Sequence, residues 1–121
     1  MTAERQQTFR DWADVSSFAL SLPDTVLSTS YGKPAVKVRG KAFIYPGREA
    51  GSFAVACPLP EKEMLMMTDP ATFWETPHYS GWPAVLIRYD RPDRERIECV
   101  IRRAWWDRAS KIQRAGFGER P

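Results

Sequence analysis

The spacing of apolar residues predicts a helix near each end of the chain. Near the start, an apolar stripe follows an N-cap expected at Thr8 and stops before Pro23, which predicts a helix over residues 8–21. Near the end, Asp93 is the expected N-cap of a longer helix. Its stripe recurs at i, i+3, i+4, i+7 and i+8, through Ile97, Val100, Ile101, Ala104 and Trp105.

Between these helices, short apolar runs separated by glycine and proline are typical of strands. Strands are expected over 26–31, 35–38, 41–45, 52–57 and 84–89. The second and third form a hairpin around Arg39-Gly40, because glycine suits a tight turn. Alternation predicts an apolar face of Val36, Val38, Phe43 and Tyr45, and a cationic face of Lys37, Arg39 and Lys41.

A short helix is expected over 59–67, with one further helical turn over 71–75. Short turns rather than helical crossovers join the strands, so the order favours an α+β fold: a two-layer sandwich of one antiparallel sheet with helices on one face. At 121 residues the chain fits a single domain spanning 1–121. The residues from about 116 onward are expected to form a frayed, flexible tail.

Composition narrows the possible classes of function. No apolar run approaches the roughly 18 residues of a membrane span, and the first residues lack a signal-peptide core, so we expect a cytoplasmic protein without membrane contact. One histidine with Cys57 and Cys99 cannot supply a zinc site, and no phosphate-binding glycine loop is present, so we expect no metal and no cofactor. Ser30, Ser80 and Cys99 lack the motif of a catalytic nucleophile, so we do not expect an enzyme.

The net charge is only +3, but the charges are unevenly distributed. Residues 31–48 contain five basic residues and no acidic one, and residues 88–121 contain ten basic residues against six acidic ones. Blocks of this kind raise the local electrostatic potential without a large net charge. Positive potential is therefore expected over two parts of the chain.

Two segments, SYGKPAVKVRGKAF (30–43) and TPHYSGWPAVLIR (76–88), together with a C-terminal helix rich in tryptophan and arginine, resemble the MmcQ/YjbR family. The resemblance extends over residues 8–111. It implies a fold related to type III secretion chaperones and frataxin-like domains, and DNA binding through a double-wing arrangement of hairpins. The matching positions are Tyr31, Gly32, Pro34, Lys37, Gly40, Lys41, Phe43, Pro77, His78, Tyr79, Gly81, Trp82, Pro83 and Arg88. The chain departs from the family pattern at Val36, where an aromatic residue is expected, and at Trp105-Trp106, where one tryptophan is typical.

The leading hypothesis is a non-enzymatic module that binds double-stranded DNA mainly through its phosphates. The candidate contacts are Lys33, Lys37, Arg39 and Lys41 near the hairpin, and Arg102, Arg103 and Lys111 in the C-terminal block. An exposed Trp106 beside these arginines would suit such a contact. Alternatively, these cations only form solvated surfaces, and the lysines guard a sheet edge against pairing.

A second candidate set, Tyr31, His78, Tyr79 and Trp82, could stack on a flat ligand or line a small-ligand pocket. Alternatively, the histidine makes one structural hydrogen bond in a packed turn. A further possibility is a chaperone-like module with a protein partner, which would show an exposed apolar patch or a two-fold dimer across the sheet. We expect a monomer or a weak homodimer.

Overall fold

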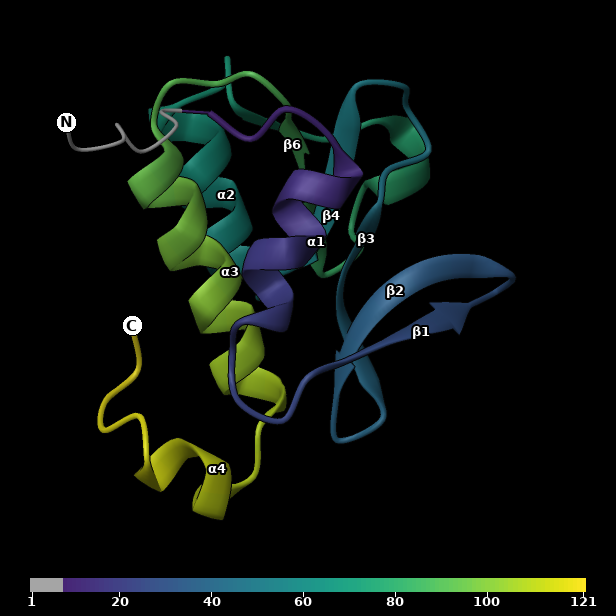
Figure 1. Ribbon diagram of the computed structural model, residues 1–121. Coiled ribbons are helices and arrows are strands. Elements are labelled where there is room, and N and C mark those ends of the chain that lie inside the picture. Colours follow the sequence, from purple (N-terminus) through teal and green to yellow (C-terminus); the bar gives the residue numbers. More distant parts are fainter. Residues whose placement is uncertain (1–7) are drawn as a thin grey trace, which may run out of the picture.

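The computed structural model describes residues 8–121. They form one six-stranded sheet of antiparallel neighbours in the order β1-β2-β3-β4-β6-β5 (Figure 1). The strands are β1 (Val26–Ser30), β2 (Lys33–Val38), β3 (Lys41–Pro46), β4 (Ser52–Ala56), β5 (Phe73–Trp74) and β6 (Ala84–Arg88). The helices are α1 (Trp12–Leu20), α2 (Leu59–Thr68), α3 (Arg94–Arg108) and α4 (Lys111–Ala115), with a short 3-10 helix η1 (Pro77–Tyr79). The predicted α+β fold with an antiparallel sheet is confirmed.

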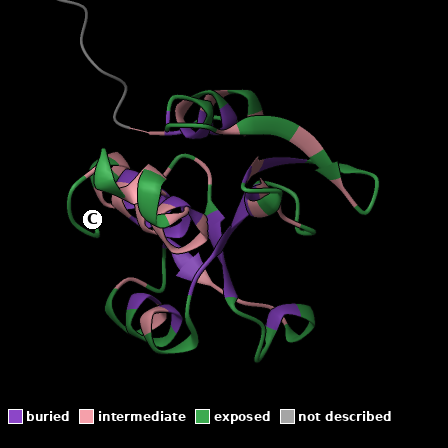
Figure 2. Ribbon diagram, turned by 90° about the horizontal axis from the view of Figure 1, so that it is seen from below, coloured by how far each residue is buried: buried purple, intermediate pink, exposed green. Residues whose placement is uncertain are grey.

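The main core lies between one face of the sheet and helices α1, α2 and α3. The stripe predicted for the last helix enters this core, since Ile97, Val100, Ile101, Ala104 and Trp105 are all buried. On the opposite face, Ala54 and Leu86 form a smaller cluster with Tyr79 of η1. Figure 2 shows buried strands in the middle of the molecule and exposed or half-buried residues along the outlying strand β1. The sheet is therefore covered by helices at its centre but not at its β1 edge.

Helix α1 begins at Trp12, about one turn later than the expected start near Thr8. Asp11 is the N-cap, and its carboxylate accepts a hydrogen bond from the Asp14 N–H at 2.9 Å. An aspartate cap satisfies one of the free N–H groups at the helix start, which is why the helix begins there.

The prediction of a helical turn over residues 71–75 is wrong. Phe73 and Trp74 form strand β5 instead, paired with Ile87 and Leu86 of β6. Phe73 is fully buried in the main core, so packing against the sheet favours an edge strand over a local helical turn.

A β-bulge in the β2–β3 hairpin changes which residues share a face. The pairing shifts register after Val36, so Phe43 is an extra residue in β3. Beyond the bulge, Ile44 packs in the main core and Tyr45 packs against the smaller cluster on the opposite face. The prediction that Val36, Val38, Phe43 and Tyr45 share one apolar face is therefore wrong for Tyr45, which lies on the opposite face.

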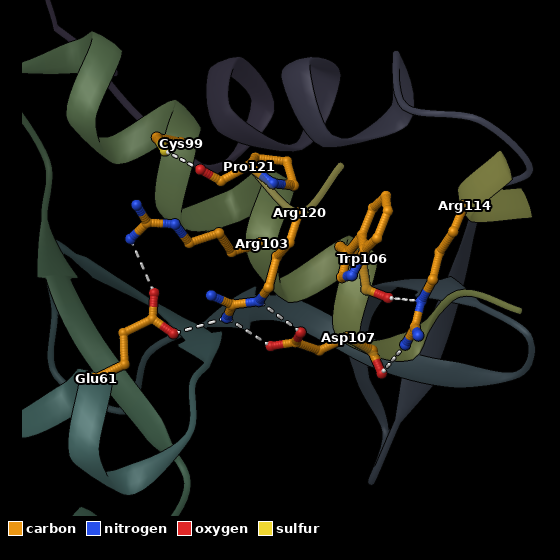
Figure 3. A network of polar contacts seen from close by, with 8 residues as sticks. All are labelled: Glu61, Cys99, Arg103, Trp106, Asp107, Arg114, Arg120 and Pro121. Atoms are coloured by element: carbon orange, nitrogen blue, oxygen red, sulfur yellow. Dashed lines mark hydrogen bonds and ion pairs between the residues drawn. The ribbon is translucent and has the colours of Figure 1, made fainter. Parts of the chain in front are cut away.

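The C-terminal residues, for which the sequence predicts a frayed tail, are joined to α2 and α3 by polar contacts (Figure 3). Arg120 donates to both carboxylate oxygens of Asp107 at 3.0 Å and to Glu61 at 2.8 Å. The Cys99 thiol donates to the Pro121 carbonyl oxygen at 3.6 Å. In this conformation the tail lies against the domain instead of extending into solvent.

Candidate nucleic-acid interface

Two hairpin turns carry candidate cations at or beside their tips. Tyr31-Gly32 joins β1 to β2, and Arg39-Gly40 joins β2 to β3 (Figure 1). Both central residues of each turn have positive φ, 53° and 77° in the first turn and 54° and 72° in the second. Two successive positive φ angles are typical of a type I′ turn, which favours glycine at the second position. The result is two hairpins that share strand β2.

The cations on these hairpins are not paired within the described part of the protein. The side chains of Lys33, Lys37, Arg39 and Lys41 make no hydrogen bond or ion pair with any of residues 8–121. Lys37 is half-buried and the other three are exposed. Unpaired cations in solvent are available to neutralise phosphate groups.

These cations do not form the single cationic face that the sequence predicts. Lys41 pairs with Val38, whose side chain enters the main core, whereas Lys37 pairs with Ala42. Directly opposite residues of an antiparallel pair lie on the same face, and successive residues alternate. Lys37 and Lys41 therefore lie on opposite faces of the ribbon, on either side of the Arg39-Gly40 turn.

Helix α3 ends beside this hairpin. Arg108 Nε donates to the Ala42 carbonyl oxygen at 3.4 Å, which joins the last turn of α3 to the start of β3. Lys111 follows at the start of α4, where it is exposed and unpaired among residues 8–121 (Figure 1). We refer to the four cations at this end of the molecule as the basic end: Arg39, Lys41, Arg108 and Lys111. The sequence alone does not mark Arg108 as part of this group, because a position on a helix does not reveal which strand lies beside it.

The two arginines predicted from α3 are paired with acidic groups. Arg102 Nη2 lies 3.7 Å from Glu98 Oε1, and its guanidinium stands 5.3 Å from the centre of the Phe18 ring. Arg103 Nη1 donates to Glu61 Oε1 at 3.0 Å (Figure 3). These two side chains connect α3 to α1 and α2 and are not part of the basic end.

Trp106 is half-buried rather than exposed. Its ring lies 6.4 Å from that of Phe117, and the Arg114 guanidinium stands 5.4 Å from it. Arg114 also donates to the Trp106 carbonyl oxygen at 2.8 Å. This tryptophan therefore packs the C-terminal segment onto α3, which leaves less of its ring available to a partner.

The other candidate set does not gather in one pocket. Tyr31 is fully exposed at the tip of the first hairpin, Trp82 is exposed, and Tyr79 is only 5% exposed within the smaller cluster. His78 Nδ1 lies 2.9 Å from Arg48 Nη1, and Nδ1 must accept this hydrogen bond because a guanidinium can only donate. This arrangement favours a packed turn with a structural histidine over a site shared with Tyr31.

A buried lysine that no sequence motif marks holds this loop in place. Lys62 of α2 is 1% exposed, and its ammonium donates to the carbonyl oxygens of Tyr79 at 2.8 Å and Trp82 at 2.9 Å. It also lies 2.7 Å from Glu75 Oε2. An ammonium has three donors, so these three acceptors replace its lost hydration. No local pattern marks this position, because all three acceptors come from a later part of the chain.

A pocket of about 440 Å³ lies between α2 and the end of α3, and Cys57, Pro83 and Arg120 are among its lining residues. Burial raises the pKa of the Cys57 thiol to about 12. A thiol with such a raised pKa stays protonated at neutral pH and is a poor nucleophile. The chemistry of this pocket therefore gives no indication of cysteine catalysis.

Within residues 8–121, no group of three or more histidine, cysteine, aspartate or glutamate residues could hold a metal ion. No helix in the same range is long and apolar enough to cross a membrane.

Comparison with known proteins identifies a family. The family model described as YjbR matches residues 20–106, which include both hairpin turns. Uncharacterized protein Mb2600 from Mycobacterium bovis and uncharacterized protein Rv2570 from Mycobacterium tuberculosis are each 36% identical to this chain over 50 residues. These alignments cover 41% of this chain and 39% of each relative. No solved structure matches significantly.

Proposed function

This chain belongs to the YjbR family, and we propose that it is a non-enzymatic module that binds double-stranded DNA mainly through the phosphates. The proposed contacts are the basic end, Arg39, Lys41, Arg108 and Lys111, together with Lys33 and Lys37 on the hairpins. Binding of this kind is salt-sensitive and weakly selective for sequence, because phosphates carry no direct sequence information.

One observation carries the proposal: cations that have no acidic partner among residues 8–121, and that come from distant parts of the sequence, lie at the same end of the fold. Arg108 at the end of α3 contacts the backbone of Ala42 in β3, next to Lys41. Had the two basic blocks lain on opposite sides of the domain, a continuous site would have been ruled out. Their proximity supports one surface that is able to contact several phosphates at once.

The hairpin shape also suits this partner. A two-stranded ribbon is narrow enough to enter the major groove of DNA, and the Arg39-Gly40 tip carries cations on both sides. Cations on opposite faces of an inserted ribbon would each have a phosphate backbone on their own side of the groove. Lys37 and Lys41 are therefore expected to contribute separately to affinity.

Arg102 and Arg103 take a different role in this proposal. Glu98 and Glu61 already lie at 3.7 and 3.0 Å from their guanidinium groups. A phosphate would have to replace a carboxylate partner, so the net gain from each contact would be smaller than for an unpaired lysine. We assign them to the packing of α3 against α1 and α2.

The test is fluorescence anisotropy with a labelled duplex at ~50 and ~200 mM salt, a range over which phosphate-driven affinity falls steeply. We expect Lys37→Ala/Lys41→Ala to bind more weakly than wild type. The slope of log affinity against log salt should fall by about 2, since each phosphate contact contributes about 0.9.

The matched control is Arg10→Ala/Arg91→Ala, which removes the same charge near the start of α3, at the end of that helix away from Arg108. This control should retain the wild-type slope. Absence of binding at the lower salt would refute the proposal. An equal loss in both double variants would show that net charge, rather than the hairpin, drives binding.

A further inference from the structure

Strand β1 is an unprotected edge of the sheet. Among residues 8–121 it pairs only with β2, and the sequence of Val26–Ser30, VLSTS, contains no charge and no proline. Val26 and Leu27 are 57% and 58% exposed. Natural sheets usually protect such an edge with lysine, proline, a bulge or a covering segment. Residues 26–30 contain no lysine, proline or bulge, and no segment within residues 8–121 pairs with their outer edge, so this edge is open to another strand.

The backbone groups that face outward can be identified from the hairpin geometry. In a two-residue hairpin the flanking residues, here Ser30 and Lys33, form a hydrogen-bonded pair, and the pattern then alternates along the ladder. Thr29 therefore occupies a position without hydrogen bonds to β2. Its partner is Pro34, which has no N–H to donate, and this agrees with the alternation. Leu27 and Thr29 thus direct their N–H and C=O groups away from β2.

These outward groups have no other partner in the described part of the protein. Among residues 8–121, the backbone of Leu27 and Thr29 receives no hydrogen bond from a loop, a cap or a side chain. The exposed groups have the spacing of a strand ladder, which favours an extended strand as partner over a helix or a small ligand.

We infer that β1 pairs with β1 of a second copy of this chain, antiparallel about a two-fold axis at Ser28. In this register Leu27 of each copy lies opposite Thr29 of the other. Both residues already direct their backbone groups outward, so each such pair exchanges two hydrogen bonds. Ser28 lies opposite its own equivalent at a position without hydrogen bonds, because its N–H and C=O already bond to β2.

The lack of charge in β1 favours a second copy of this chain as the strand that pairs with its outer edge. No charged residue lies within β1, so pairing about the two-fold axis places no like charges opposite each other. The nearest charged residues along the chain, Asp24 and Lys33, both lie outside β1, so the pairing places neither of them opposite its own equivalent.

One consequence rests on the proposed DNA binding, although the pairing itself does not. A two-fold axis perpendicular to a continuous sheet keeps equivalent residues on the same face. The Lys37 side chains of both copies would then lie on one face of the joined sheet, and a dimer would contact DNA with two hairpins rather than one.

The register is tested by disulfide crosslinking of Ser28→Cys in a Cys99→Ser background. Paired residues without hydrogen bonds have Cα atoms about 4.5 Å apart, within the range that a disulfide spans. The control is Ser30→Cys in the same background, because the two equivalents of Ser30 would be separated by four strand positions, about 13 Å. We expect a disulfide-linked dimer for the first variant and little for the second. If Ser28→Cys and Ser30→Cys crosslinked equally, or if neither crosslinked, the proposed register would be overturned.

The pairing is tested by sedimentation velocity without DNA, over a range of protein concentrations. Thr29→Pro removes an outward N–H that β2 does not use, so the hairpin and the fold, checked by circular dichroism, should persist while the dimer dissociates. Thr29→Val keeps the N–H and should dimerise like wild type. A monomeric wild type, or a Thr29→Pro variant that still dimerises, would overturn the inference. Neither result depends on whether the protein binds DNA.

Discussion

Two sets of cations in this domain differ in what surrounds them. Lys62 is almost completely buried, and its ammonium contacts three oxygens, the farthest at 2.9 Å. Lys41, near the tip of a hairpin, is exposed and contacts no acceptor among residues 8–121. The first lysine links α2 to the loop after β5. The second is available to a partner from outside the chain.

The difference shows that positive charge along the sequence does not by itself locate a binding surface. Arg103 belongs to the same basic block as Lys111, yet Glu61 accepts a hydrogen bond from its guanidinium at 3.0 Å. Lys111 has no such neighbour among the described residues. A paired cation stabilises contacts between elements, whereas an unpaired cation can attract an anion from outside the chain.

The largest effect is expected from Lys62→Ala. Removing this ammonium leaves two carbonyl oxygens and the Glu75 carboxylate without their shared partner, which should lower the free energy of unfolding by about 3 kcal/mol. The measurement is urea denaturation, with Lys41→Ala as the control. The exposed control should change stability by no more than about 0.5 kcal/mol. A comparable loss in both variants would remove the distinction between the two sets.

A smaller effect is expected from Arg120→Ala, which breaks the contacts of the C-terminal segment with Asp107 and Glu61. Because these groups are partly exposed to solvent, the expected loss of stability is at most about 1 kcal/mol. The stability of Arg120→Lys should lie between those of Arg120→Ala and wild type. A lysine keeps the charge but cannot form the forked contact with Asp107. Equal stability of Arg120→Ala and wild type would show that the tail contacts contribute nothing.

The smallest effect sharpens the comparison within the C-terminal block. Lys111→Ala should lower the slope of log DNA affinity against log salt by about 1 and leave stability unchanged. Arg103→Ala should leave that slope unchanged and lower stability slightly, because its partner is Glu61 rather than a phosphate. The opposite pattern would place the DNA contact on α3 and exclude Lys111 from it.

Much of the fold could be predicted because it depends on near neighbours in the sequence. The stripe from Ile97 to Trp105 predicts both the last helix and its buried side, and Arg39-Gly40 predicts a hairpin turn. The predictions failed where distant segments intervene. Phe73 is a strand residue because β6 lies beside it, and Tyr45 changes face because a bulge inserts Phe43 into β3.

The candidate site divides in the same way. The sequence identified the hairpin cations Lys37, Arg39 and Lys41, which are unpaired among residues 8–121. It did not identify Arg108, whose place beside the hairpin depends on where α3 ends against β3. It also did not separate Arg102 and Arg103 from Lys111, because their carboxylate partners come from other turns or other helices.

The sequence by itself determined most of the helices and strands, where glycine closes a turn, and where basic residues concentrate. These properties follow from periodicity and backbone conformation, which act over a few residues. Only the tertiary structure decided which cations are neutralised, which face of the hairpin each cation occupies, and which edge of the sheet is left open. Those outcomes depend on distances of a few ångströms between groups far apart in the chain, and such distances exist only once the helices have packed on the sheet.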